Sequence, residues 1–128
     1  MQNTHANEAF LDECAAEAGA DPVEVRLRLP PREEARGREV LERVARLANR
    51  QTRPGPQRDR AGEVLRGRGV SCRKYELVRT SFAGVAEVEA NRRTGGIRVT
   101  RFFCFHDCGR MVHPGGVRRR SGAASSTA

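Results

Sequence analysis

The apolar residues of this chain change their spacing at a polar stretch, residues 49–62, and this change constrains the fold more than any other feature. Before the stretch they recur with the period of an α-helix, and after it they lie in segments rich in Val, Phe and Tyr, which are typical of strands. The stretch itself consists mainly of Asn, Gln, Thr, Arg, Pro, Gly and Asp, as loops do. The sequence therefore predicts an α+β fold in which N-terminal helices precede a small antiparallel sheet.

A first helix is expected at residues 6–18, followed by Gly19, which can adopt the left-handed conformation that ends a helix. A second, short helix begins at Asp21-Pro22, because an Asp side chain can cap the free amides and proline suits the first helical position. Pro30 and Pro31 end it. The apolar stripe of the first helix consists of Phe10, Leu11, Cys14, Ala15 and Ala18.

Residues 33–48 have the clearest helical pattern in the chain. Glu39 and Arg43 stand four positions apart, in the order that favours an ion pair on a helix surface. The apolar face of this third helix consists of Val40, Leu41, Val44, Leu47 and Ala48.

Strands are expected at residues 67–77, 80–90 and 97–106, and residues 91–96 have the Asn and Gly content of a hairpin loop. Residues 107–114 suggest an ordered turn, whereas residues 121–128 contain only Ser, Gly, Ala and Thr and offer little to pack. We therefore divide the chain into a helical segment, a linker, a β-rich segment and a disordered tail. These are residues 1–50, 51–66, 67–118 and 119–128.

The chain has 128 residues, the size of one domain or part of one, and its 38% apolar content is a thin supply for a core. The net charge of +8 is uneven: residues 1–31 carry two Arg against six acidic side chains, and the rest carries 22 basic against 10 acidic ones. Such a balance suits an anionic partner, so one alternative is a small basic, non-catalytic module that binds nucleic acid or a protein. Nucleic acid is the less favoured partner, because no aromatic residues are interleaved with the basic ones.

The four cysteines, at positions 14, 72, 104 and 108, lack the spacing of a secreted disulfide framework. The N-terminus shows no basic leader followed by an apolar segment, and no run approaches the ~18 apolar residues of a membrane span. These features predict a cytoplasmic protein without a membrane partner.

The densest chemical cluster is residues 104–108, followed by His113. Cys104, His106 and Cys108 are zinc-ligand types, but alternate residues of a strand are ~6.6 Å apart, whereas zinc ligands converge within ~2.3 Å of the ion. We therefore predict no metal site. A Cys108 nucleophile with His106 or His113 as base would lack an orienting residue, so no catalytic residue is assigned.

Two further patterns carry less information. Gly67-Arg68-Gly69 could place backbone amides near an anion, but a turn into a strand explains the glycines equally well. His5 precedes the first predicted helix and is most simply a solvated side chain.

A series of short motifs lies in order along residues 2–118: Asn7-Glu8-Ala9-Phe10-Leu11-Asp12-Glu13, Asp21-Pro22-Val23-Glu24, Arg26-Leu27-Arg28, Gly67-Arg68-Gly69-Val70, Val85-Ala86-Glu87-Val88 and Asp107-Cys108-Gly109 with Pro114. Each motif is modest, but their ordered combination is specific. Together they resemble the molybdopterin-binding large subunits of the xanthine dehydrogenase and aldehyde oxidase family, including its isoquinoline 1-oxidoreductase-like and aldehyde dehydrogenase-like members.

The resemblance implies that this α+β segment is part of a larger molybdenum cofactor-binding domain. In that family the intact enzyme hydroxylates aldehydes or N-heterocycles at a molybdenum centre held by a molybdopterin-type cofactor, and an iron–sulfur small subunit receives the electrons. Family large subunits are several times longer than this chain, and their catalytic Glu has no counterpart here. The resemblance thus implies an oxidoreductase fragment that is inactive alone, from a cytoplasmic or periplasmic parent.

The neighbourhood of the cofactor contact departs from the family pattern. After Asp107-Cys108-Gly109, family members usually have Val-Asn-Pro, whereas this chain has Val112-His113-Pro114. A Gln that contacts the pterin follows in the family, but Arg119 or Arg120 stands near its position here. The resemblance therefore implies that no cofactor-binding residue is intact.

The sequence of the last residues can be explained by a change of reading frame in the gene. A synonymous back-translation of residues 118–128, read in another frame, encodes Ala-Gln-Ile-Gly-Gly-Gly-Ile-Val-Tyr-Gly, which restores the family pattern. We therefore expect the tail at residues 119–128 to be an out-of-frame translation without a selected role.

Overall fold

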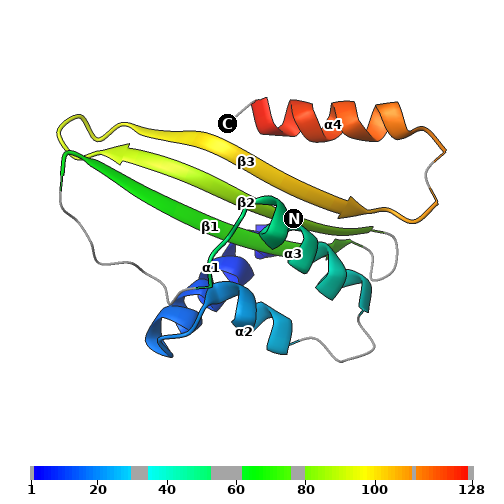
Figure 1. The fold of residues 1–128 in the computed structure, drawn as a ribbon, viewed down its shortest axis with the longest axis horizontal. Coiled ribbons are helices and arrows are strands. Elements are labelled where there is room, and N and C mark those ends of the chain that lie inside the picture. Colours follow the sequence, from blue (N-terminus) through cyan, green and yellow to red (C-terminus); the bar gives the residue numbers. More distant parts are fainter. Residues whose placement is uncertain (1, 30–34, 53–61, 76–79, 111, 127–128) are drawn as a thin grey trace.

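The computed structural model describes residues 2–29, 35–52, 62–75, 80–110 and 112–126. The elements follow one another as α1 (Gln2–Glu17), α2 (Pro22–Arg28), α3 (Ala35–Leu47), β1 (Val64–Tyr75), β2 (Thr80–Asn91), β3 (Ile97–Asp107) and α4 (Pro114–Ser126). The strands form one antiparallel sheet with β2 in the centre. Helices α1 to α3 lie together on one side of the sheet, and α4 runs alongside β3 on the other side (Figure 1). The predicted α+β arrangement is confirmed.

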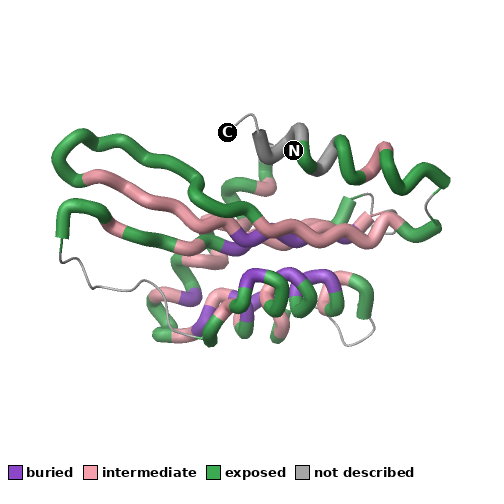
Figure 2. The backbone as a smooth tube through the Cα atoms, turned by 45° about the horizontal axis from the view of Figure 1, so that its top comes forward, coloured by how far each residue is buried: buried purple, intermediate pink, exposed green. Residues whose placement is uncertain are grey.

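The core lies between α3 and the sheet, where the buried stretches of the tube face one another (Figure 2). Val44 of α3 and Val85 of β2 are both 0% exposed. Leu47 was expected in this core but is 57% exposed. It lies at the margin of the stripe that the other apolar residues of α3 define, because successive residues turn by ~100°. The buried members of the core are Val23, Val40, Leu41, Val44, Ala48, Val70, Ala83 and Val85.

The apolar stripe predicted for α1 is only partly right. Ala15 is completely buried, but Phe10 is 65% exposed. The helix instead turns Glu8 and Asp12 toward α2, where both carboxylates pair with Arg26. Since charged side chains fix this helix, the apolar pattern did not identify its contact face. Of the other predicted stripe residues, Leu11 is half-buried, and Cys14 and Ala18 are exposed.

The predicted start of α2 is confirmed. The Asp21 side chain accepts hydrogen bonds from the amides of Val23 at 2.8 Å and Glu24 at 3.1 Å, and Gly19 before it has a φ of +59°. Arg50, which follows α3, lies 2.8 Å from the Asp21 carboxylate. The cap therefore also joins α2 to the end of α3.

The linker predicted at residues 51–66 is too long, because β1 already begins at Val64. Val64 pairs with Asn91 and Arg66 pairs with Glu89, so the polar start of β1 is held by the long hairpin strand β2. Pairing with β2 thus outweighs the loop-like composition on which the prediction rested. The central part of the predicted linker, residues 53–61, and the end of the first predicted strand lie outside the described residues.

The tail differs from the expectation, since residues 114–126 form the helix α4. Pro114 occupies the first helical position, and Arg and Ala are strong helix formers, so the segment satisfies its own backbone hydrogen bonds. The prediction treated the lack of packing side chains as a lack of secondary structure, which does not follow for a helix. Among the described residues no helix is long and apolar enough to cross a membrane.

Candidate functional site

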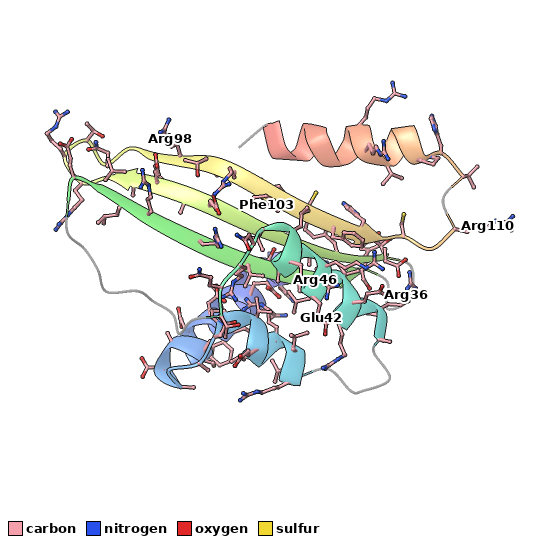
Figure 3. All side chains as sticks on the ribbon, viewed as in Figure 1. Arg36, Glu42, Arg46, Arg98, Phe103 and Arg110 are labelled. Atoms are coloured by element: carbon pink, nitrogen blue, oxygen red, sulfur yellow. The ribbon has the colours of Figure 1, made fainter. Side chains whose placement is uncertain are left out.

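The motif Asp107-Cys108-Gly109 forms a turn at the end of β3, and Arg36 in the first turn of α3 holds it in place. Arg36 donates from Nε to Oδ2 of Asp107 at 2.7 Å and from Nη2 to Oδ1 at 2.9 Å. The amide of Gly109 donates to the same Oδ1 at 2.9 Å, and Gly109 has a φ of +67°, which favours glycine. Figure 3 shows Arg36 on α3 near the end of β3 where the turn begins. The carboxylate thus closes the turn and ties it to α3.

The contact between Arg36 and Asp107 shifts the pKa of both side chains. The hydrogen bonds from the Arg36 guanidinium, together with that from the Gly109 amide, lower the pKa of Asp107 to about 2. In return, the hydrogen bond to Asp107 raises the pKa of Arg36. Asp107 is therefore ionised at neutral pH, and both of its carboxylate oxygens accept hydrogen bonds that hold the turn against α3.

The chain after the turn enters α4 at His113. The carbonyl oxygen of His113 accepts hydrogen bonds from the amides of Gly116 at 3.1 Å and Val117 at 3.4 Å. A Cβ atom placed on Gly115 or Gly116 would lie 3.4 Å from the His113 ring. The imidazole therefore covers the glycine pair at the start of α4, where the family pattern has an Asn side chain. Pro114, the other motif residue here, is exposed.

The arginines at the family's Gln position lie on α4. Arg119 is exposed, and the side chain of Arg120 lies outside the described part of the structure. Cys108 is half-buried in the turn that precedes α4. Within the described residues, Arg119 makes no hydrogen bond or ion pair with the turn.

Near the turn, Cys104 and His106 are partly buried side chains of β3. His106 packs edge-on against Phe82 with ring centroids 4.8 Å apart, and burial lowers its pKa. Burial likewise raises the pKa of Cys104. Among the described residues no three His, Cys, Asp or Glu side chains are grouped so as to hold a metal ion. The glycines of Gly67-Arg68-Gly69 lie inside β1 and pair with β2.

A highly connected polar residue, Arg26, was not assigned a role from the sequence. It is 4% exposed and reaches Glu8 at 3.0 Å and Asp12 at 2.6 Å. Arg26 also donates to the backbone oxygens of Pro22 and Glu8, both at 3.1 Å. The signal that could have identified Arg26 is an arginine in a short apolar helix that follows an acidic helix. No local signal could have identified Arg36, because its partner is 71 residues away.

Among known proteins, the chain is similar to a nicotinate dehydrogenase subunit of Pseudomonas putida. The two sequences are 39% identical over 129 aligned positions, a match that covers 94% of this chain and 10% of the relative. The chain thus spans about a tenth of the length of the protein that it resembles. No protein-family profile matches the chain.

The residues near the turn do not make a complete site for a molybdopterin-type cofactor. Both carboxylate oxygens of Asp107 are taken by Arg36 and Gly109, and Arg119 is an exposed cation on α4. The described residues around the turn offer no free buried donor or acceptor, since no buried side-chain nitrogen or oxygen among them is without a hydrogen bond. No chemical step is therefore assigned to this chain.

Proposed function

We propose that the chain corresponds to a scaffold segment from the large, molybdenum cofactor-binding subunit of a xanthine dehydrogenase-type hydroxylase. The observation that carries this proposal is the 39% identity to a dehydrogenase subunit along 94% of the chain. The ordered motifs between residues 7 and 114 support the same assignment.

In the intact parent, an aldehyde or an N-heterocycle is the substrate, the molybdenum cofactor supplies the oxidation chemistry, and an iron–sulfur subunit takes up the electrons. The name of the relative favours nicotinate, an N-heterocycle, among these substrate classes. The parent is cytoplasmic or periplasmic. The segment contributes no catalytic residue.

The role of the segment is to hold the Asp107-Cys108-Gly109 turn at the end of a rigid strand. The Arg36–Asp107 pair locks the turn onto α3, and α3 is fixed to the sheet by the apolar core. A residue that contacts the cofactor shortly after such a turn would be held in place by the turn, as functional side chains are on rigid elements. The chain therefore keeps the structural support of the turn. It lacks the Gln that contacts the pterin in the family, since Arg119 stands near that position.

The coding DNA and its flanks test the proposal directly. We expect the flanking regions to encode the remainder of a large subunit, and the alternative frame over residues 118–128 to encode Ala-Gln-Ile-Gly-Gly-Gly. Flanks without such coding capacity in any frame would contradict the assignment.

A protein-level test complements the genetic one. The 128-residue chain, produced in a host that makes the cofactor, should contain no stoichiometric molybdenum and should not oxidise nicotinate with an artificial electron acceptor. The large subunit with its frame restored, co-produced with its small subunit, should contain molybdenum and should oxidise nicotinate. Turnover by the short chain would overturn the scaffold role.

A further inference from the structure

The hairpin end of the sheet, opposite to the Asp107 turn, carries two rows of charged side chains. In the first row, Glu89 of β2 lies between Arg66 of β1 and Arg98 of β3. The Nε of Arg66 is 3.0 Å from one carboxylate oxygen, and Nη2 of Arg98 is 2.7 Å from the other. Figure 3 shows Arg98 at the hairpin end of the sheet, away from α3.

The second row is built in the same way, one step closer to the core. Glu87 of β2 accepts hydrogen bonds from Arg68 of β1 and from Nε of Arg101 of β3. The Arg101 guanidinium also lies over the ring of Phe103, 5.7 Å from its centroid. Each row therefore has one carboxylate between two guanidinium groups.

A β-bulge places both rows on the same face of the sheet. Arg98 and Arg101 are three positions apart and would point to opposite faces of a regular strand. The register shifts here, since Glu87 pairs with Arg101 while the next residue of β2 pairs with Val99. Thr100 is the extra residue, and its hydroxyl donates to the Glu87 carbonyl at 3.2 Å. The bulge thus aligns two arginines of β3 with the two glutamates of β2.

The rows keep an excess of positive charge. Hydrogen bonds, led by those from Arg101 and Arg98, lower the pKa of Glu87 and Glu89 respectively. Both carboxylates are therefore ionised at neutral pH. They are shared among the four guanidinium groups of the two rows, so the two rows together carry a net charge of +2.

Arg66 and Arg101 have guanidinium N–H groups that are not bound by a glutamate. The side chains of Arg66 and Arg101 are 81% and 65% exposed, and each meets its glutamate through Nε. Their Nη groups make no hydrogen bond within the described residues. Beside them lies an open hollow, which we call the hairpin-end hollow. Its lining is Asn49, Gln51, Arg66, Gly67, Arg68, Glu87, Val88, Glu89, Thr100 and Arg101.

We propose that the hairpin-end hollow binds a phosphate dianion, with the Nη groups of Arg66 and Arg101 as its main donors. A dianion would offset the two excess positive charges, and the planar fork of a guanidinium matches the oxygens of phosphate. The glutamates hold each fork by Nε and thereby orient the remaining N–H groups before a ligand arrives. Asn49 and Gln51 line the same hollow and carry amide donors. This site is distant from the turn and does not depend on the function proposed above.

The test is a titration of the purified, ¹⁵N-labelled chain, followed by NMR at constant ionic strength. Glycerol phosphate and inorganic phosphate are added in separate arms, with sodium chloride as the reference. We expect saturable shifts of the Arg66 and Arg101 side-chain Nε–H signals and of the Gly67 and Thr100 amides. Tighter binding of glycerol phosphate would identify a phosphate ester as the ligand class, and tighter binding of inorganic phosphate would identify the free ion.

Two variants test the arginines against a matched control. Arg66→Gln and Arg101→Gln should each weaken phosphate binding about tenfold, because each removes charge-assisted hydrogen bonds. Arg93→Gln is the control, since Arg93 is 75% exposed and pairs with Glu63 outside the hollow. It should bind phosphate within twofold of the wild type. The proposal is overturned if phosphate gives no saturable shift beyond chloride, or if Arg93→Gln weakens binding as much as the other two.

Discussion

The carboxylate of Glu8 in α1 accepts a hydrogen bond from the backbone amide of Cys72 in β1, at a distance of 3.0 Å. The same oxygen, Oε2, lies 3.0 Å from Nε of Arg26. Because β1 is an edge strand, its outer amides have no neighbouring strand to bind, and α1 supplies a partner for one of them. One glutamate thus joins the first helix, the second helix and the sheet.

Replacing Arg26 should therefore destabilise the protein strongly. In Arg26→Ala the carboxylates of Glu8 and Asp12 lose their common partner, and breaking a buried pair costs about 3 kcal/mol or more. Urea unfolding followed by circular dichroism measures the loss. Arg28→Ala is the control, because Arg28 is 76% exposed and pairs with Glu24 on the same helix. It should change the free energy of unfolding by less than about 0.5 kcal/mol. Equal effects of the two variants would refute the central role of Arg26.

The core between α3 and the sheet offers a second comparison. Leu41 is 2% exposed, whereas Leu47 in the same helix is 57% exposed. Leu41→Ala should lower the free energy of unfolding by about 2 to 4 kcal/mol, because it leaves a cavity, and Leu47→Ala by well under 1 kcal/mol. The same urea experiment checks both. A larger effect at Leu47 would mean that α3 presents another face to the sheet.

The Arg36–Asp107 pair predicts a particular pH dependence. The pKa of Asp107 is about 2 in the folded protein, compared with an ordinary value of 3.8. Its ionised form therefore stabilises the fold above about pH 4, and this contribution is lost as the pH falls toward 2. Asp107→Asn should have a lower urea midpoint than the wild type at pH 6, and the two midpoints should converge as the pH approaches 2. Glu17→Gln, an exposed change in α1, should show no such convergence. A constant difference between Asp107→Asn and wild type at all pH values would contradict the assignment.

These features differ in how far the sequence could predict them. The cap formed by Asp21 and the apolar stripe that includes Val44 are patterns within one or two helical turns, and both the cap and the burial of Val44 were predicted correctly. An ordered turn at residues 107–114 was predicted from the sequence, and the resemblance to known proteins pointed to Asp107-Cys108-Gly109 within it, but neither revealed what holds the turn in place. Its partner Arg36 lies 71 positions away, and no local pattern links the two.

The errors have the same physical origin. The contact face of α1 was misread because Glu8 is held there by Arg26 across 18 positions, a contact invisible to apolar periodicity. The two charged rows were missed because Arg98 and Arg101 share a face only through the bulge at Thr100. Local sequence thus predicted the first three helices and the three strands, though not α4, and long-range pairing decided which sides of these elements meet.

The cysteines should differ in their reactivity. Burial raises the pKa of Cys72 to about 11, whereas Cys14 is exposed on α1. At pH 8 only ~0.1% of a thiol with that pKa is thiolate, the reactive form. We expect iodoacetamide to modify Cys14 at least about tenfold faster than Cys72, as measured by peptide mass spectrometry. In urea the two rates should become similar. Equal rates in the folded protein would show that Cys72 is not protected.

Removing α4 should leave the rest of the fold intact. Among the described residues α4 has no extended contact with another helix or strand, and its first turn is capped by His113 of its own segment. A chain that stops after His113 should therefore unfold within about 0.5 kcal/mol of the full chain and lose only helical signal. A chain that stops after Asn91 is the control. It lacks β3, which packs Phe103 and Phe105 against the core, and should not fold. If the first truncation also failed to fold, α4 would be a structural part of the protein, and the idea of an out-of-frame tail without a role would fail with it.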